Sequence, residues 1–176
     1  AQEAGADFLV SLPPFFFSMR QDWIYEFYTA IADETDLPLM LYTILGPIHT
    51  NIQPATARRL SERPDIVGMK DSEGFAHVQE TVFLTQDKNF KILTGQETDF
   101  FASLRIGAVG GVLSAGNICP RLCANIYDLT VAGDHAQAIE LQKKLNRLMA
   151  DLAALTRGTT SWWGVIKTGL QLLGVC

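Results

Sequence analysis

The stretch DIVGMKDSEG, residues 65–74, begins with an apolar run that ends at Lys70. Polar residues follow at once, from Asp71 to Glu73. Such a run is typical of a buried strand, and a lysine at its exit is unusual because lysine is seldom fully buried without a partner. Desolvation there disfavours the ammonium form and leaves a free amine that can attack a carbonyl carbon. Lys70 is therefore predicted to be a Schiff-base-forming nucleophile. The alternative is a strand-end lysine whose ammonium group reaches water.

Strand-like and helix-like patterns alternate outward from this run. Short apolar runs bounded by glycine or proline predict strands, and apolar residues at helical spacing predict the helices between them. Strands are expected at 8–12, 37–42, 66–70, 90–94 and 111–114, and intervening helices at 21–36, 54–62, 75–85 and 99–106. Repeated βα units form a parallel sheet with right-handed crossovers. The sequence therefore predicts an α/β fold of about five such units.

A helical tail follows the last predicted strand. Helices are expected at 121–132 and at 161–173, with a third between them that Asp134 caps after Gly133 ends the first. Apolar residues recur along that middle helix and predict a buried stripe. Its members are Ile139, Leu141, Leu145, Leu148, Met149 and Leu152.

The ends of two neighbouring strands carry the most reactive side chains. Reactive residues of parallel α/β folds lie at the carboxyl ends of strands, and Tyr42 and Lys70 both occupy such ends on consecutive units. A phenol and an amine at one mouth make a proton shuttle beside a covalent nucleophile. The alternative for Tyr42 is an interior aromatic ring whose hydroxyl is satisfied by a neighbour.

The composition is that of a globular chain with a mild excess of acidic residues. Of 176 residues 48% are apolar, and the net charge of −5 argues against nucleic acid or an anionic membrane as a partner. No apolar stretch reaches the roughly 18 residues of a membrane span, and the first residues do not resemble a secretory signal, so a cytoplasmic protein is predicted. The three cysteines, Cys119, Cys123 and Cys176, are expected to be reduced thiols, and no metal site is expected.

Six segments carry a family resemblance over nearly the whole chain. They are GAD at 5–7, PFF at 14–16, LPLMLY at 37–42, IVGMKDS at 66–72, TG at 94–95 and GAVGGV at 107–112. In this order they resemble the dihydrodipicolinate synthase and N-acetylneuraminate lyase superfamily of Schiff-base-forming class I aldolases. The resemblance implies a (β/α)8 TIM barrel, with strands 4 to 8 in residues 1–118. Residues 119–176 would form the last barrel helix and the C-terminal helices.

The resemblance also implies a mechanism and an assembly. Lys70 would attack the keto carbon of pyruvate or a related 2-keto acid to form an imine, and Tyr42 would relay protons while a carbon–carbon bond is made or broken. The protonated imine is the electron sink, so no metal or organic cofactor is expected. The partners would be a 2-keto acid and an aldehyde, and members of this superfamily are commonly homo-oligomers, so a dimer or tetramer is expected.

The length of the chain departs from the family pattern. A complete barrel of this kind needs around 250 residues. The family's first three strands, including the segment that binds the keto-acid carboxylate, have no counterpart here. The chain is therefore expected to be the C-terminal portion of a longer protein. A truncated homologue without catalytic activity stays an alternative.

Further departures bear on the second substrate. Dihydrodipicolinate synthases carry an arginine five residues after the tyrosine and a pair of tyrosines after the fourth strand. This chain has Pro47 at the first position and Phe15 and Phe16 at the others. These changes count against lysine biosynthesis, although synthase-type and sugar-acid dehydratase activities stay alternatives.

The polyol-binding positions of the lyases favour a hydroxylated aldehyde, such as one derived from a sugar acid. In this chain those positions fall on Ser72, Gly95, Glu97 and Ser114, which can hydrogen-bond hydroxyls. Thr98 is a departure, because the lyases have a second acidic residue there. The alternative for the serines is ordinary capping at strand ends. By resemblance the substrate-binding residues are Thr43, Ser72, Gly95, Glu97, Val112 and Ser114.

Overall fold

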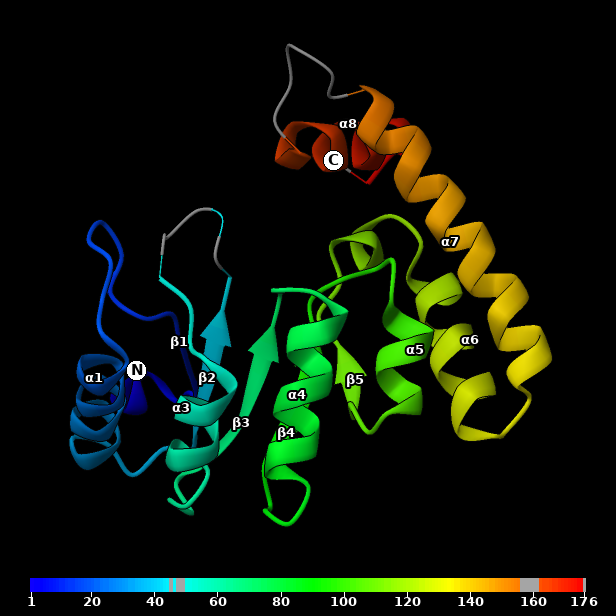
Figure 1. Ribbon diagram of the computed structural model, residues 1–176. Helices are drawn as coiled ribbons and strands as arrows, with labels where there is room; N and C mark the ends of the chain where they lie inside the picture. Colours follow the sequence, from blue (N-terminus) through cyan, green and yellow to red (C-terminus); the bar gives the residue numbers. More distant parts are fainter. Residues whose placement is uncertain (45, 47–49, 156–161, 176) are drawn as a thin grey trace.

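The computed structural model describes residues 1–44, 46, 50–155 and 162–175. Its centre is one parallel sheet in which the strands lie in sequence order (Figure 1). The strands are β1 (Leu9–Ser11), β2 (Leu39–Thr43), β3 (Ile66–Asp71), β4 (Lys91–Thr94) and β5 (Gly110–Gly111). Sequential parallel neighbours are the arrangement of a (β/α)8 barrel wall, so the predicted fold class, a partial TIM barrel, is confirmed.

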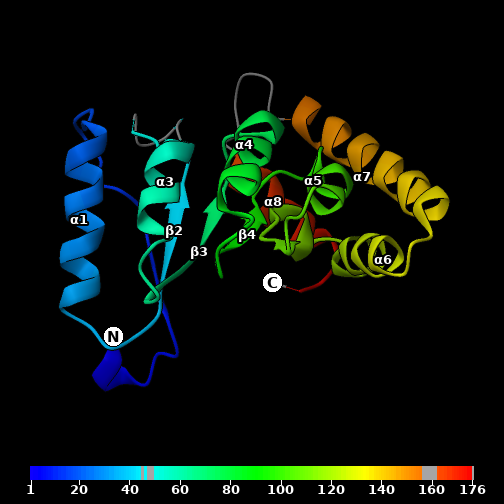
Figure 2. The same ribbon diagram turned by 60° about the horizontal axis from the view of Figure 1, so that its bottom comes forward.

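A helix follows each of the first four strands. These helices lie side by side along one face of the sheet (Figure 2). The bounds are α1 (Gln21–Asp33), α3 (Pro54–Leu60), α4 (Phe75–Thr85) and α5 (Phe100–Arg105). Each strand therefore crosses to the next through a helix on the same side, as right-handed βα units require.

The main core lies between the sheet and this helix layer. Leu41, Met69 and Ile92 point from three neighbouring strands toward the helices, where they pack with Ile24 and Tyr28 of α1. Successive side chains of a strand face opposite ways, so the next residues of each strand point to the other face of the sheet. That second face carries the residues of the candidate site.

The chain after β5 forms its own helical layer. The short 3-10 helix η2 (Ser114–Asn117) is followed by α6 (Pro120–Val131), α7 (His135–Leu155) and α8 (Trp162–Leu172). A second core joins α5 to α6 and α7 through Phe100, Ile126, Leu145 and Met149. This core crosses the boundary predicted at residue 118, which stays a prediction. Figure 1 shows α7 rising to the end of the sheet where the strands finish, with α8 lying across that end.

Most element bounds differ from the sequence prediction by one or two residues, and three details differ by more. The first helix ends at Asp33 rather than residue 36, and the next residues form a turn in which the Thr35 hydroxyl accepts the Leu37 amide. The last strand is Gly110–Gly111 instead of 111–114, because Ser114 leaves the sheet to bond with Glu97. Ile139 is 40% exposed rather than buried, since it lies at the edge of the stripe of α7. The predicted cap is confirmed, as Asp134 accepts the amide of Gln137.

No helix among the described residues is long and apolar enough to cross a membrane.

Candidate active site

Tyr42 and Lys70 lie next to each other at the carboxyl ends of β2 and β3. They are paired in the register of the two strands, and the Lys70 Nζ lies 4.0 Å from the centroid of the Tyr42 ring. Both point away from the core that Leu41 and Met69 enter, and both are half-buried. The sequence predicted the exit of a buried strand, and the structure places the lysine head on an aromatic ring at a partly open mouth. A cation on a ring face gains electrostatic stabilisation from the ring.

Glycine at position 68 lets β3 and β4 approach closely beside this pair. A Cβ atom there would lie 2.3 Å from the main-chain oxygen of Lys91, a distance at which backbone atoms would have to move. The register of the strand ends therefore depends on glycine two residues before Lys70. The short run Gly-Met-Lys therefore contains both the lysine and the glycine that sets the strand register beside it.

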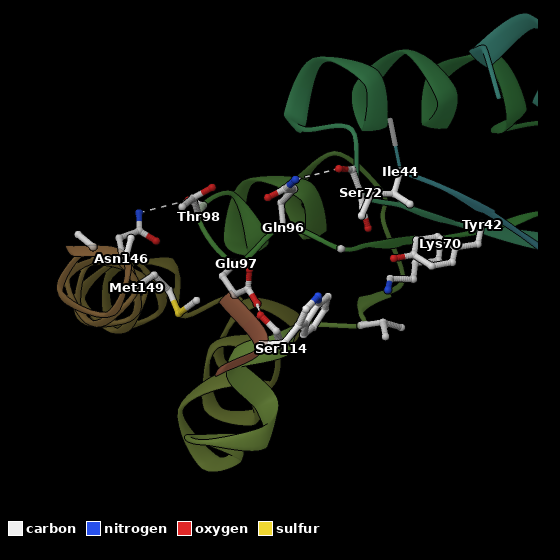
Figure 3. Close-up of a pocket in the computed structure, with 15 residues that line it drawn as sticks. Tyr42, Ile44, Lys70, Ser72, Gln96, Glu97, Thr98, Ser114, Asn146 and Met149 are labelled. Atoms are coloured by element: carbon white, nitrogen blue, oxygen red, sulfur yellow. Dashed lines mark hydrogen bonds between the residues drawn. The ribbon is translucent and has the colours of Figure 1, made fainter. Parts of the chain in front are cut away.

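A pocket of about 470 Å³ opens beyond the strand ends (Figure 3). It takes one side from the ends of the strands and the other from the C-terminal helices. Six of the predicted site residues contribute alongside Tyr42. The lining residues are Tyr42, Ile44, Lys70, Ser72, Gly95, Gln96, Glu97, Thr98, Val112, Ser114, Asn146, Met149, Ala150, Ala153 and Trp163.

Glu97 is the buried acid of this pocket. One carboxylate oxygen, Oε1, accepts hydrogen bonds from the Ser114 hydroxyl at 2.5 Å and from the Ala115 amide at 3.0 Å. These bonds join the loop after β4 to the segment after β5. They hold the Glu97 carboxylate toward the cavity opposite Lys70, as Figure 3 shows.

Gly95 and Ser72 are in close contact on the same rim. A Cβ atom at Gly95 would lie 1.9 Å from the Ser72 Oγ, so only glycine fits there without moving the serine. The Gln96 side chain donates to the Ser72 main-chain oxygen at 2.8 Å. Gly95 therefore contributes space, and Ser72 contributes the hydroxyl.

Thr43 is the predicted site residue whose side chain does not line the pocket. It points to the helix side of the sheet and is fully buried. Its hydroxyl donates to Glu73 Oε1 at 2.8 Å and accepts the Ile52 amide at 3.1 Å. The alternation of side chains along β2 explains this placement, because neighbours of Tyr42 must face the opposite way.

One wall of the pocket comes from α7 and α8, the helices of the predicted C-terminal tail. Asn146 and Met149 of α7 and Trp163 of α8 face the strand ends across the cavity (Figure 3 labels the first two). Trp163, which lies in the last predicted helix, therefore lines the mouth of the pocket. The apolar stripe of α7 was visible in the sequence. Helical periodicity, however, does not show which residues of a helix line a pocket.

A buried aspartate–histidine pair lies behind the strand ends. Asp71 is fully buried, and its carboxylate Oδ2 lies 2.6 Å from Nδ1 of His77 in α4. Burial by itself lowers the pKa of His77, but the hydrogen bond and charge of Asp71 and the charge of Glu73 outweigh it, so the His77 pKa is raised. Burial has the opposite effect on an acid, and it raises the pKa of the nearby Asp99 carboxyl. The pair stabilises the β3–α4 junction next to Lys70.

Some of the sequence predictions concern residues whose structure is not described. Pro47 and Cys176 are among them, as is residue 161, the start of the last predicted helix. Cys119 and Cys123 are free thiols, and burial raises the pKa of each, that of Cys123 to about 12. Across the described ranges no cluster of three or more metal-ligating side chains is present.

The parallel βα units and the lysine–tyrosine pair at their carboxyl ends define a class, the lysine-bearing (β/α)8 barrels. The sequence model of the dihydrodipicolinate synthetase family matches residues 1–176. The chain belongs to this family, as its six segments predicted.

Individual relatives agree with the family. The chain is 32% identical over 170 residues to 4-hydroxy-tetrahydrodipicolinate synthase of Nitrosomonas europaea, and 33% identical over 175 residues to that of Thermodesulfovibrio yellowstonii. These matches cover 97% and 99% of the chain and 58% of each relative. The solved structure of dihydrodipicolinate synthase from Bacteroides thetaiotaomicron has a TM-score of 0.90 at 31% identity, covering 99% of this chain and 59% of that one. The chain thus spans a little over half of its relatives' length.

Proposed function

We propose that the protein containing this chain is a Schiff-base-forming lyase or aldolase that acts on pyruvate or a related 2-keto acid and an aldehyde. The observation that carries this proposal is the Lys70 ammonium on the face of Tyr42, at the carboxyl ends of two barrel strands and at the rim of a pocket. A lysine so placed meets the geometric requirement for covalent catalysis with a neighbouring acid–base group.

The reaction proceeds through an imine. Lys70 first loses its ammonium proton, and the neutral amine attacks the keto carbon to give a carbinolamine. Protonation of its hydroxyl and loss of water then give a protonated imine. Removal of a proton from the adjacent carbon gives an enamine, whose electron pair forms the bond to the aldehyde carbon; cleavage is the reverse. Tyr42 carries protons to and from the oxygen atoms in these steps. Because the protonated imine accepts the electron pair, we propose that no metal or organic cofactor takes part.

The second substrate in this proposal is a neutral, hydroxylated aldehyde. The Ser72 and Ser114 hydroxyls and the Glu97 carboxylate can bond to substrate hydroxyls. Val112 and Gly95 shape the rim. Among the described lining residues Lys70 is the one cation, so a second substrate carboxylate would lack a charged partner in this part of the pocket. The Thr43 hydroxyl is occupied, and the Thr43 main-chain oxygen accepts the Ser72 amide at 3.0 Å, so the substrate contact predicted for Thr43 stays a prediction.

A synthase-type condensation is the second candidate. Its support is the similarity to the two relatives above, which are 4-hydroxy-tetrahydrodipicolinate synthases at 32% and 33% identity. Phe15 and Phe16 argue against a synthase, since they stand where the synthases have tyrosines and phenylalanine cannot transfer protons. A sugar-acid dehydratase is a variant of the first candidate, because it begins from the same imine. A homologue without catalytic activity is the outcome to be excluded by experiment.

We further propose a homo-oligomer, either a dimer or a tetramer, that resides in the cytoplasm and binds neither nucleic acid nor membranes. Supporting the oligomer are three consecutive phenylalanines, Phe15, Phe16 and Phe17, which are 71% to 79% exposed at the end of the sheet. Large apolar side chains grouped on a surface mark interaction sites. The acidic balance supports the absence of nucleic acid and anionic membrane partners.

The test is reductive trapping of the imine. Protein carrying this chain is incubated with pyruvate and borohydride, digested and mapped by mass spectrometry. We expect a reduced pyruvyl adduct on Lys70 and none on the exposed Lys91, which serves as an internal control lysine. Lys70→Arg keeps the charge but removes the nucleophile, so no adduct is expected. A folded protein without any adduct on Lys70 would overturn the proposal.

A further inference from the structure

Gln142 of α7 binds both ends of the pocket loop that follows β4. It is 8% exposed, although glutamine in a surface helix ordinarily faces water. Its Oε1 accepts the Phe101 amide at 2.9 Å, and its Nε2 donates to the Glu97 main-chain oxygen at 2.7 Å. One side chain thereby links residues on either side of the turn that begins α5.

The carboxamide is suited to this position for a chemical reason. Phe101 is in the first turn of α5, where amides have no partner within the helix, so it needs an acceptor. The Glu97 carbonyl needs a donor. A carboxamide supplies one of each, whereas an aliphatic side chain would leave the Phe101 amide unsatisfied and the Glu97 carbonyl with its long bond of 3.4 Å from the Phe100 amide.

The same side chain also orients a residue of the pocket wall. The Gln142 Nε2 donates to Asn146 Oδ1 at 2.6 Å, and the Asn146 Nδ2 donates to the Thr98 main-chain oxygen at 3.2 Å. Figure 3 shows Asn146 bonded to Thr98 at the edge of the cavity. The acceptor role of Asn146 toward Gln142 therefore fixes which face of its amide is presented to Thr98 and to the pocket.

We propose that Gln142 is a positioning residue for recognition of the second substrate. It holds the Glu97 main chain from α7, while Ser114 and Ala115 hold the Glu97 carboxylate from the other side. The carboxylate is thus fixed before a hydroxylated aldehyde arrives, and the C-terminal helices take part in selectivity without Gln142 touching substrate. This inference rests on the proposed function, and it predicts that Gln142 acts on binding of the aldehyde and not on imine formation at Lys70.

The test compares Gln142→Met with Gln137→Met. Methionine has nearly the shape of glutamine without its hydrogen-bonding groups, and Gln137 is an exposed glutamine of the same helix. For Q142M we expect KM for a hydroxylated aldehyde, glyceraldehyde as the probe, to rise about tenfold, which corresponds to about 1.4 kcal/mol. We expect kcat and borohydride trapping of pyruvate on Lys70 to change less than about twofold. Q137M is expected to match the unsubstituted protein in all three.

A second readout does not depend on the reaction. The Ala115 amide donates to the Glu97 carboxylate, so its hydrogen exchange, measured by NMR, reports whether that carboxylate stays in place. We expect about tenfold faster exchange in Q142M and no change in Q137M. If the unsubstituted protein forms no adduct on Lys70, the proposed function fails, while this measurement still decides the role of Gln142.

Three results would overturn the inference. They are unchanged Ala115 exchange in Q142M, an unchanged KM for glyceraldehyde in an active Q142M, and a loss of trapping on Lys70 equal to the loss of turnover. If Q142M does not fold, Gln142→Glu is measured instead, because it keeps the acceptor for Phe101 and loses the donor to Glu97. For Q142E the expected changes in KM and exchange have the same direction, and the absence of both would contradict the proposal.

Discussion

At the scale of the residue, Tyr42 has two separable parts. Its ring lies under the Lys70 ammonium, with 4.0 Å between Nζ and the ring centroid, and its hydroxyl is the group proposed to transfer protons. The ring therefore positions the Lys70 amine, and the hydroxyl transfers protons in the steps that follow. Substitution of Tyr42 by phenylalanine removes the hydroxyl and keeps the ring.

Tyr42→Phe is expected to lower kcat by about 10² to 10⁴, the usual contribution of a general acid–base group. The reduced pyruvyl adduct on Lys70 is still expected, although it forms more slowly, because the amine and the ring remain. Turnover assays and trapping on the same preparation check this. Undiminished turnover in the variant would remove Tyr42 from the mechanism.

Gly95 is the residue where shape alone is decisive. Gly95→Ala would place a methyl group 1.9 Å from the Ser72 Oγ, so the rim of the pocket must shift. We expect a loss of about 1–3 kcal/mol in the free energy of unfolding, measured with urea. Gly116→Ala is the control, since a Cβ atom at Gly116 meets no atom within 4 Å. Equal stabilities of the two variants would contradict the predicted clash.

At the scale of the element, the junction of β3 and α4 has a buried aspartate–histidine pair in addition to apolar packing. Asp71, the residue after Lys70, accepts the Glu73 amide with Oδ1 at 3.0 Å and pairs with His77 through Oδ2. Gly74 before α4 has a φ of 113°, a backbone conformation that glycine adopts without strain. The strand that presents Lys70 is therefore fixed to the helix behind it by a titratable pair.

The raised pKa of His77 gives this junction a pH dependence. The folded protein binds the His77 proton more tightly than the unfolded chain, so the pair contributes its full stabilisation below the unfolded pKa of about 6.5. That contribution is lost as pH rises through the higher folded pKa. We expect the free energy of unfolding of the parent to fall relative to that of His77→Gln over this window, measured by urea titration. Parallel pH profiles for the two proteins would show that His77 is not linked to folding.

At the scale of the whole molecule, one end of the sheet exposes apolar side chains. Phe16 is 79% exposed and has a φ of 89°, a left-handed conformation that costs a bulky residue about 1–3 kcal/mol. An exposed aromatic held in such a conformation is consistent with contact to another molecule. We attribute it to association of copies of the protein.

Phe16→Asn tests that attribution, because asparagine tolerates the left-handed region and is polar. We expect sedimentation velocity to show a smaller species than the parent, with no loss of thermal stability in the monomer. Phe83→Asn on α4, where Phe83 is 52% exposed, is the control and is expected to keep the parental assembly. A monomeric parent, or an unchanged oligomer in F16N, would contradict the proposed assembly.

The sequence by itself determined the class of fold and the central pair. Apolar runs such as 65–70, alternating with helical periods, predict βα units, and the carboxyl ends of consecutive strands must share one edge. Tyr42 and Lys70 therefore had to meet. Helix α4 was predicted with its observed bounds, Phe75–Thr85, because its apolar spacing is regular.

Tertiary structure alone decided the rest of the pocket. That Ser114 leaves the sheet for Glu97, and that Gln142 reaches 45 residues back along the chain to bond the Glu97 carbonyl, depend on contacts between distant segments. Local periodicity contains no information about such contacts, because they arise only when neighbouring strands pair and α7 packs against α5. The sequence could therefore place the nucleophile, whereas the packing of the helices determined which groups surround it.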